Sequence, residues 1–145
     1  MATKASKVKR VTKTQPRAAQ RFSGGSPLER EEQQILAAWL DAKGVLWFHP
    51  PNEGKRKAWI GAKMKAQGLK SGVPDVMIFE QWYDKESPII DATGFGIAVE
   101  LKRQCGGNAS QAQYDWLMAL RKRGWKAVLC YGADEAIEFL KRMLK

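Results

Sequence analysis

The order of hydrophobic periodicities along the chain constrains its fold more than any other feature of the sequence. Helical spacing of apolar residues indicates helices over 26–44, 110–123 and 134–144, with a short helix around 58–67. Short apolar runs typical of strands cover 45–48, 73–79, 96–102 and 127–131, and residues 80–94 are predicted to be a connection. The order is therefore helix, three strands, helix, strand, helix. This order predicts an α/β fold in which helices flank a central mixed four-stranded sheet.

Capping signals predict where two of the helices begin. In Ser26-Pro27-Leu28-Glu29, Ser26 is expected at the N-cap, with proline at the first helical position and Glu29 at the third. Ser110 and Gln113 have the same spacing and predict the start of the helix over 110–123.

The charge of the chain indicates a polyanionic partner. It has 25 Lys and Arg against 15 Asp and Glu, a net charge of +10. Residues 1–22 hold seven of these basic residues and no acidic one, so we expect 1–25 to be a flexible basic arm and 26–145 to be a single folded domain. Such an arm suits non-specific contact with phosphates, and a solubilising tail is the alternative.

Several classes of protein are excluded or disfavoured. No apolar run is long enough to span a bilayer, and no apolar stretch follows the basic N-terminus as in a secretory signal. Cys105 and Cys130 lack the spacing of a zinc site and are expected to be reduced thiols. We therefore expect a cytoplasmic protein that does not associate with membranes.

Two predicted strands carry polar residues that a buried sheet does not need. Residues two apart on a strand face the same side, so Glu100 and Lys102 should project together, with Leu101 on the opposite face. If the two strands pair, Asp75 reaches that same side. Two close carboxylates repel unless a cation lies between them, and hard oxygen ligands suit Mg²⁺ or Mn²⁺. The alternative is that Asp75 caps a turn and the other two are solvated residues at a strand end.

These residues resemble a known family. Gly72-Val73-Pro74-Asp75 followed by Val99-Glu100-Leu101-Lys102 resembles the signature of the PD-(D/E)XK nucleases, whose core is restriction-endonuclease-like. The downstream pattern is similar to the VRR-NUC branch, which includes stand-alone phage and bacterial nucleases; its residues here are Ser110, Gln113, Leu117, Leu120, Gly124 and the strand end Cys130-Tyr131-Gly132. The resemblance covers about residues 28–144.

The resemblance implies a DNA phosphodiesterase that depends on Mg²⁺ or Mn²⁺. Asp75 and Glu100 would be metal ligands, the backbone carbonyl of Leu101 a further metal contact, and Lys102 the catalytic lysine. Gln113 matches a glutamine that faces the active site in the family, although it is an equally good capping partner for the residue three positions before it.

The family also places a glutamate of the first helix near the metal. Glu29, four residues before Gln33, fits this position best, although its capping role is an equally good local explanation. Glu32 is the rival because it lies on the apolar stripe of the same helix.

Residues 49–70 are the best candidates for contact with DNA. Basic side chains with an interleaved aromatic one suit phosphates and unstacked bases, and a solvated basic face is the alternative. The predicted DNA-binding residues are Lys55, Arg56, Lys57, Lys63, Lys65 and Lys70, together with His49, Asn52 and Ser110, and Trp59 lies among them. His49 and Asn52 lie in a segment that resembles a turn of the family before the basic stretch, and a structural role is the alternative for the lone histidine.

The sequence thus favours an endonuclease that selects DNA by its structure, with a branched substrate such as a four-way (Holliday) junction. Nucleases of this size often act as homodimers, so that two sites cut two strands. A catalytically silent nucleic-acid-binding module of the same fold is the alternative, and a basic structural protein of a ribosome or virion would not need the carboxylates.

Overall fold

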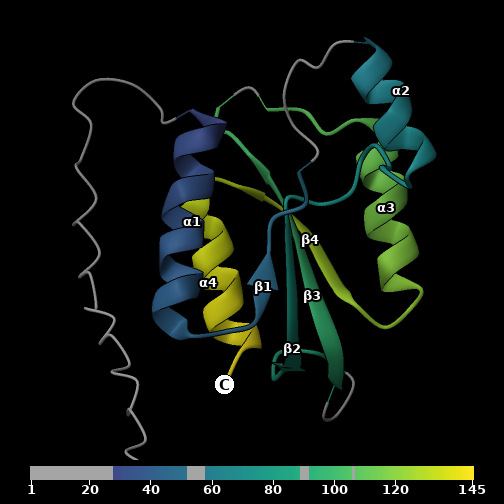
Figure 1. Cartoon of the computed structure of the whole chain (residues 1–145). Coiled ribbons are helices and arrows are strands. Elements are labelled where there is room, and N and C mark those ends of the chain that lie inside the picture. Colours follow the sequence, from purple (N-terminus) through teal and green to yellow (C-terminus); the bar gives the residue numbers. More distant parts are fainter. Residues whose placement is uncertain (1–27, 52–57, 89–91, 106) are drawn as a thin grey trace, which may run out of the picture.

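The computed structural model describes residues 28–51, 58–88, 92–105 and 107–145 (Figure 1). Along the chain the elements are α1 (Glu29–Lys43), β1 (Trp47–Phe48), α2 (Ala58–Ala66), β2 (Val76–Asp84), β3 (Ala92–Lys102), α3 (Gln111–Arg121), β4 (Lys126–Tyr131) and α4 (Ala133–Met143). The predicted α/β fold with a mixed four-stranded sheet and flanking helices is confirmed. None of the described helices is long and apolar enough to cross a membrane.

The sheet has the strand order β1-β2-β3-β4. The pairs β1–β2 and β2–β3 are antiparallel, whereas β3 and β4 are parallel. A parallel pair needs a crossover connection, and α3 supplies it between the two strands. The register pairs Val76 with Val99 and Lys102 with Tyr131, so β2 begins where β3 ends.

Helices cover both faces of the sheet (Figure 1). α1 and α4 lie on one face and α3 lies on the other. The alternation of β3 follows this arrangement: Val99 and Leu101 are buried in the cluster beneath α1 and α4, whereas Ala98 packs in the cluster beneath α3. Glu100 and Lys102 follow Ala98 at intervals of two residues on β3, so their side chains point to the same face, the one that α3 covers.

The prediction that residues 80–94 form a connection is wrong. β2 continues to Asp84, and β3 already begins at Ala92. The pairing register of the two strands is interrupted by an irregularity between Ile78 and Gln81 of β2. This irregularity interrupts the alternation that would reveal a long strand. Gly96 (φ 88°) lies under the ring of Trp125, where an added Cβ would be 2.5 Å from a ring atom, so a glycine is required inside a strand.

The start of the first helix also differs from the prediction. α1 begins at Glu29 with Leu28 at the N-cap, two residues later than expected. The backbone N–H of Leu28 donates to Oε2 of Glu31 at 2.9 Å. Glu31 therefore occupies the third helical position and is the capping carboxylate, in place of the predicted Glu29.

Part of the predicted chain lies outside the described residues: the basic arm (1–25), Asn52, Lys55, Arg56 and Lys57. Of the two cysteines, Cys105 is exposed and Cys130 is buried, and both are free thiols.

Candidate active site

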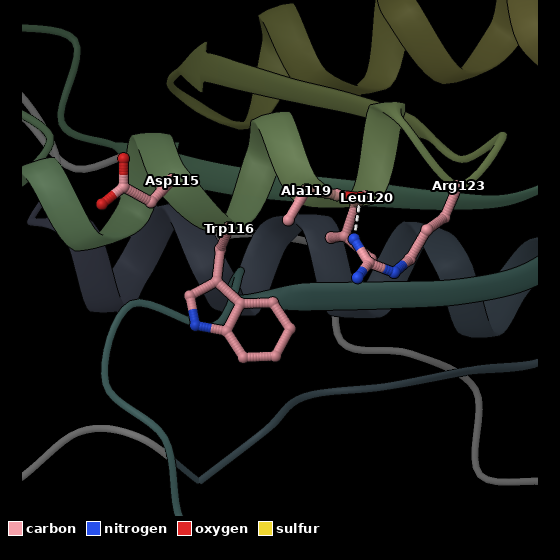
Figure 2. A pocket seen from close by; sticks show the side chains of 5 residues that line it. All are labelled: Asp115, Trp116, Ala119, Leu120 and Arg123. Atoms are coloured by element: carbon pink, nitrogen blue, oxygen red, sulfur yellow. Dashed lines mark hydrogen bonds between the residues drawn. The ribbon is translucent and has the colours of Figure 1, made fainter.

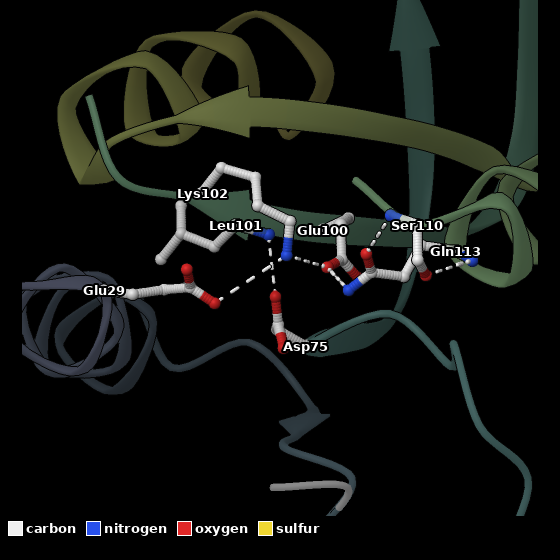
Figure 3. A network of polar contacts seen from close by, with 7 residues as sticks. All are labelled: Glu29, Asp75, Glu100, Leu101, Lys102, Ser110 and Gln113. Carbon is white, nitrogen blue, oxygen red and sulfur yellow. Dashed lines mark hydrogen bonds and ion pairs between the residues drawn. The ribbon is translucent and has the colours of Figure 1, made fainter. Parts of the chain in front are cut away.

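The structure brings Asp75, Glu100 and Lys102 together where β2 begins and β3 ends (Figure 3). Nζ of Lys102 donates to Oε1 of Glu100 at 2.6 Å. Oδ2 of Asp75 accepts from the backbone N–H of Leu101 at 2.8 Å, which fixes this carboxylate against the neighbouring strand. All three side chains are buried, and Glu100 is completely so. Glu100 and Lys102 are therefore not the solvated residues at a strand end that the alternative from the sequence expected.

The environment of these groups changes their proton affinities. Burial, followed by the charge of Asp75, raises the pKa of Glu100 from 4.5 to about 7, although Lys102 opposes the rise. Burial by itself would lower the pKa of Lys102, but the hydrogen bond and the charge of Glu100 outweigh it and raise that pKa above 10.5. The lysine is therefore an ammonium at neutral pH, and the cluster holds more acids than bases.

One oxygen of Glu100 indicates that a cation fits here. Its Oε2 atom is buried and has no hydrogen-bond partner among the described residues, an arrangement that is costly for an ionised carboxylate. Within the described ranges, no three His, Cys, Asp or Glu side chains are arranged as a ready metal site. Mg²⁺ is commonly held by only one or two carboxylates and completes its shell with water and substrate oxygens. The carboxylates of Asp75 and Glu100 supply the number that such an ion needs.

Gln113 takes part both in the cap of α3 and in the acidic cluster. Its Nε2 donates to Oε1 of Glu100, from the face that α3 covers. Its Oε1 accepts from the backbone N–H of Ser110 at 2.7 Å, while Oγ of Ser110 accepts from the backbone N–H of Gln113 at 3.3 Å. This confirms the predicted capping box, and the same side chain links the start of α3 to Glu100.

The two glutamates of the first helix have different surroundings. Oε1 of Glu29 lies 3.7 Å from Nζ of Lys102, and its side chain is partly exposed. Glu32 is only 2% exposed, and its Oε2 accepts from the backbone N–H of Ala133 at 2.7 Å, at the first residue of α4. The structure thus places Glu29 at the lysine and Glu32 at the positive end of a helix.

Glu32 also completes a ring of contacts around Lys102. The backbone N–H of Gly132 donates to the carbonyl oxygen of Lys102 at 2.8 Å, and the next residue, Ala133, is the one that Glu32 binds. Glu29, one helical turn before Glu32, closes the ring at Nζ. Sequence reasoning missed this role of Glu32, because no local pattern marks a partner 101 residues away.

His49 contacts the site through the backbone. Its Nδ1 lies 2.6 Å from the carbonyl oxygen of Asp75, so the Nδ1–H tautomer donates to this oxygen. The sequence suggested for His49 either a contact with the substrate or a structural role. In the structure its imidazole joins the end of β1 to the residue that supplies one carboxylate.

The described basic candidates lie on and after α2. Lys63, Lys65 and Lys70 are all exposed, and no residue of α2 is buried. A separate apolar hollow of about 410 Å³ lies along α3 (Figure 2) and shares no residue with the acidic cluster; it is lined by Asp115, Trp116, Ala119, Leu120 and Arg123.

The fold defines the class of the protein, an α/β domain with a mixed four-stranded sheet flanked by helices. The sequence profile of the VRR-NUC domain matches residues 27–134. The chain therefore belongs to the VRR-NUC family, which is a nuclease-type family.

A solved structure described as a VRR-NUC domain protein has the same fold. It superposes with a TM-score of 0.65 and is 23% identical, and the match covers 83% of this chain and 90% of that one. No curated protein matches the chain.

Proposed function

We propose that the protein is a metal-dependent DNA endonuclease. The observation that carries the proposal is Glu100, a fully buried carboxylate beside a second carboxylate and an ammonium, with one oxygen that has no partner in the part of the chain that the structure describes. A fold does not retain such a group for stability, because its ionised form is poorly solvated. Groups with strongly shifted pKa values concentrate at functional sites.

Each residue of the cluster has a distinct role in this proposal. Asp75, Glu100 and the Leu101 carbonyl would hold Mg²⁺ or Mn²⁺, which when bound offsets phosphate charge and lowers the pKa of a coordinated water. Lys102 is held as an ammonium, so it suits the orientation of a water molecule and the stabilisation of negative charge on the scissile phosphate. It does not suit the role of a general base.

Two further side chains orient this machinery. Gln113 donates to Oε1 of Glu100, the oxygen that Lys102 also binds, and so leaves Oε2 as the oxygen for the cation. Glu29 lies on the other side of the ammonium and limits where Nζ can point.

The proposed substrate is branched DNA, such as a four-way junction. Lys63, Lys65 and Lys70 are exposed cations that would contact the backbone, together with the basic residues of segment 52–57 and of the arm 1–25. Contacts to phosphates position a protein without reading base sequence, which supports selection by DNA shape. We further propose that residues 26–145 act as one domain, that two copies form a homodimer to cut two strands, and that the protein is cytoplasmic.

A cleavage assay tests the proposal. The protein is incubated with linear, flapped and four-way DNA, with Mg²⁺, with Mn²⁺ or with a chelator, and the cut positions are mapped. We expect cleavage only with a divalent ion, and none by Glu100→Gln. Glu138→Gln is the matched control, because Glu138 lies in an exposed ion pair on α4 and should cleave as wild type. Cleavage of all DNA shapes at equal rates would refute the structure selectivity, and cleavage in the chelator would refute the metal dependence.

A further inference from the structure

Helix α2 (Ala58–Ala66) presents a large aromatic side chain to solvent. Trp59 is 66% exposed, and the helix contains no buried residue. A single exposed apolar side chain is ordinary on a protein surface. Trp59 differs from the other exposed aromatic residues in the charges around it.

The segment that contains Trp59 has only one sign of charge. Residues 54–74 include six basic residues and no acidic one. Lys63 follows Trp59 by four residues and so lies on the same side of α2, whereas the exposed Lys65 lies about half a turn further round the helix. An aromatic ring with one ammonium group on its own side of the helix and a second further round, and with no carboxylate in the segment, matches a nucleotide, which combines an aromatic base with a phosphate.

The chain after α2 is anchored next to the active site. Nε1 of Trp116 donates to the carbonyl oxygen of Ser71 at 3.0 Å, from the same ring that Figure 2 shows on α3. Gly72 (φ 81°) packs so closely that an added Cβ would lie 2.6 Å from the backbone of Ala112. Ala112 precedes Gln113, the residue that binds Glu100. Figure 1 shows α2 at the end of the sheet where β2 begins and β3 ends, which is the end that carries the acidic cluster.

We propose that Trp59 stacks on an unpaired base of the DNA substrate while Lys63 and Lys65 contact its flanking phosphates. The bases of a continuous duplex hide their faces in the stack, whereas unpaired bases at a branch or bulge expose them. Stacking on an aromatic side chain tolerates any base, so it would select DNA by structure and not by sequence. The inference rests on the proposed function for its substrate class and names the substrate feature that is recognised.

Binding of the full chain to labelled DNA tests this inference, with a chelator present so that no cleavage occurs. The probes are a paired duplex, the same duplex with a bulge of unpaired thymidines, and single-stranded oligothymidine. Trp59→Ala should weaken binding to the two probes with unpaired bases by about 5-fold or more, the effect of losing one stacked base. Its affinity for the paired duplex should change by less than about 2-fold, and Trp59→Phe should keep most of the wild-type affinity.

Two controls separate stacking from other effects. Phe95→Ala removes another exposed aromatic side chain, from the first half of β3, and should leave binding to all probes unchanged. The double variant Lys63→Ala/Lys65→Ala should weaken binding to every probe and flatten its salt dependence. Because Trp59 is exposed on a helix without buried residues, its variants should unfold at the wild-type temperature.

The outcomes distinguish this inference from the proposed nuclease function. Equal loss of affinity for all three probes, or no loss for any, would overturn the stacking role even if the wild type cleaves DNA. A change from dimer to monomer in Trp59→Ala, with DNA affinity unaltered, would assign the ring to a protein interface and would also overturn it. Selective loss for the unpaired probes in a protein that never cleaves would support the stacking role and refute the enzyme.

Discussion

Replacing Glu100 by glutamine should stabilise the metal-free protein while it abolishes cleavage. The carboxylate of Glu100 is fully buried, and its pKa is raised from 4.5 to about 7 by burial and by Asp75. Between pH 4.5 and about 7, Glu100 is therefore protonated in the folded protein and ionised in the unfolded chain. As a result, the free energy of unfolding falls as the pH rises from about 4.5 to 7 and stays low above that range.

The size of the effect follows from the shift. One pKa unit corresponds to about 1.4 kcal/mol, so ionised Glu100 costs up to about 3 kcal/mol near pH 8. In Glu100→Gln the amide oxygen can still accept from Lys102 and Gln113, and an N–H₂ group replaces the unpartnered Oε2. The midpoint temperature of the variant should exceed that of wild type by about 10 °C near pH 8. At about pH 4.5 to 5 the difference should almost vanish, because wild-type Glu100 is then protonated.

Thermal unfolding in a chelator, followed by circular dichroism across this pH range, measures the difference. Glu138→Gln serves as the control and should follow wild type at every pH, since its carboxylate is exposed. Added Mn²⁺ should raise the midpoint of wild type and raise that of Glu100→Gln much less, because the variant has lost one of the two carboxylates proposed to bind the ion. A variant that is no more stable than wild type near pH 8 would refute the reasoning, as would a stability gain of equal size at every pH.

Three further predictions concern the residues that hold the site. Lys102→Met should lower the single-turnover cleavage rate by about 10²-fold while Mn²⁺ and DNA still bind; the exposed Lys141→Met is its control, and an unchanged rate would make Lys102 an ordinary residue of the strand end. His49→Ala should lower that rate by about 10-fold by releasing the Asp75 backbone, whereas His49→Asn can still donate and should recover most of it; equal rates for both variants and wild type would exclude the positioning role. Glu32→Ala should reduce the free energy of unfolding by about 2 to 4 kcal/mol in chemical denaturation, and Glu32→Gln by much less because its amide oxygen can still accept from α4; similar losses in both would show that the charge, and not the hydrogen bond, matters.

The parts of the site that could be predicted from the sequence depend on short-range rules. The period of two along a strand places Glu100 and Lys102 on one face, and antiparallel pairing brings Asp75 beside them. The capping box at Ser110 is equally local, since its two hydrogen bonds join residues three apart. These rules require only that the strands form and pair.

The contacts that could not be predicted join distant parts of the chain. The bond from Ala133 to Glu32 depends on how α1 packs against α4, and the contact of His49 with Asp75 depends on the pairing of a two-residue edge strand. The start of α1 was mispredicted because Glu29 and Glu31 offer competing registers for a capping carboxylate, and the structure uses Glu31.

The way in which the site is held explains how the fold tolerates Glu100. Each charged group of the cluster is fixed by a neutral or oppositely charged partner: Asp75 by the Leu101 N–H, Lys102 by two glutamates, and Glu100 by Lys102 and Gln113. Oε2 of Glu100 lacks such a partner among the described residues, so an electrostatic cost remains at this oxygen. A cation bound at that oxygen would remove the cost, and the same contact would bring the ion close to the ammonium of Lys102. Stability of the metal-free protein and affinity for the ion are therefore opposed at Glu100, so a substitution that improves the first must weaken the second.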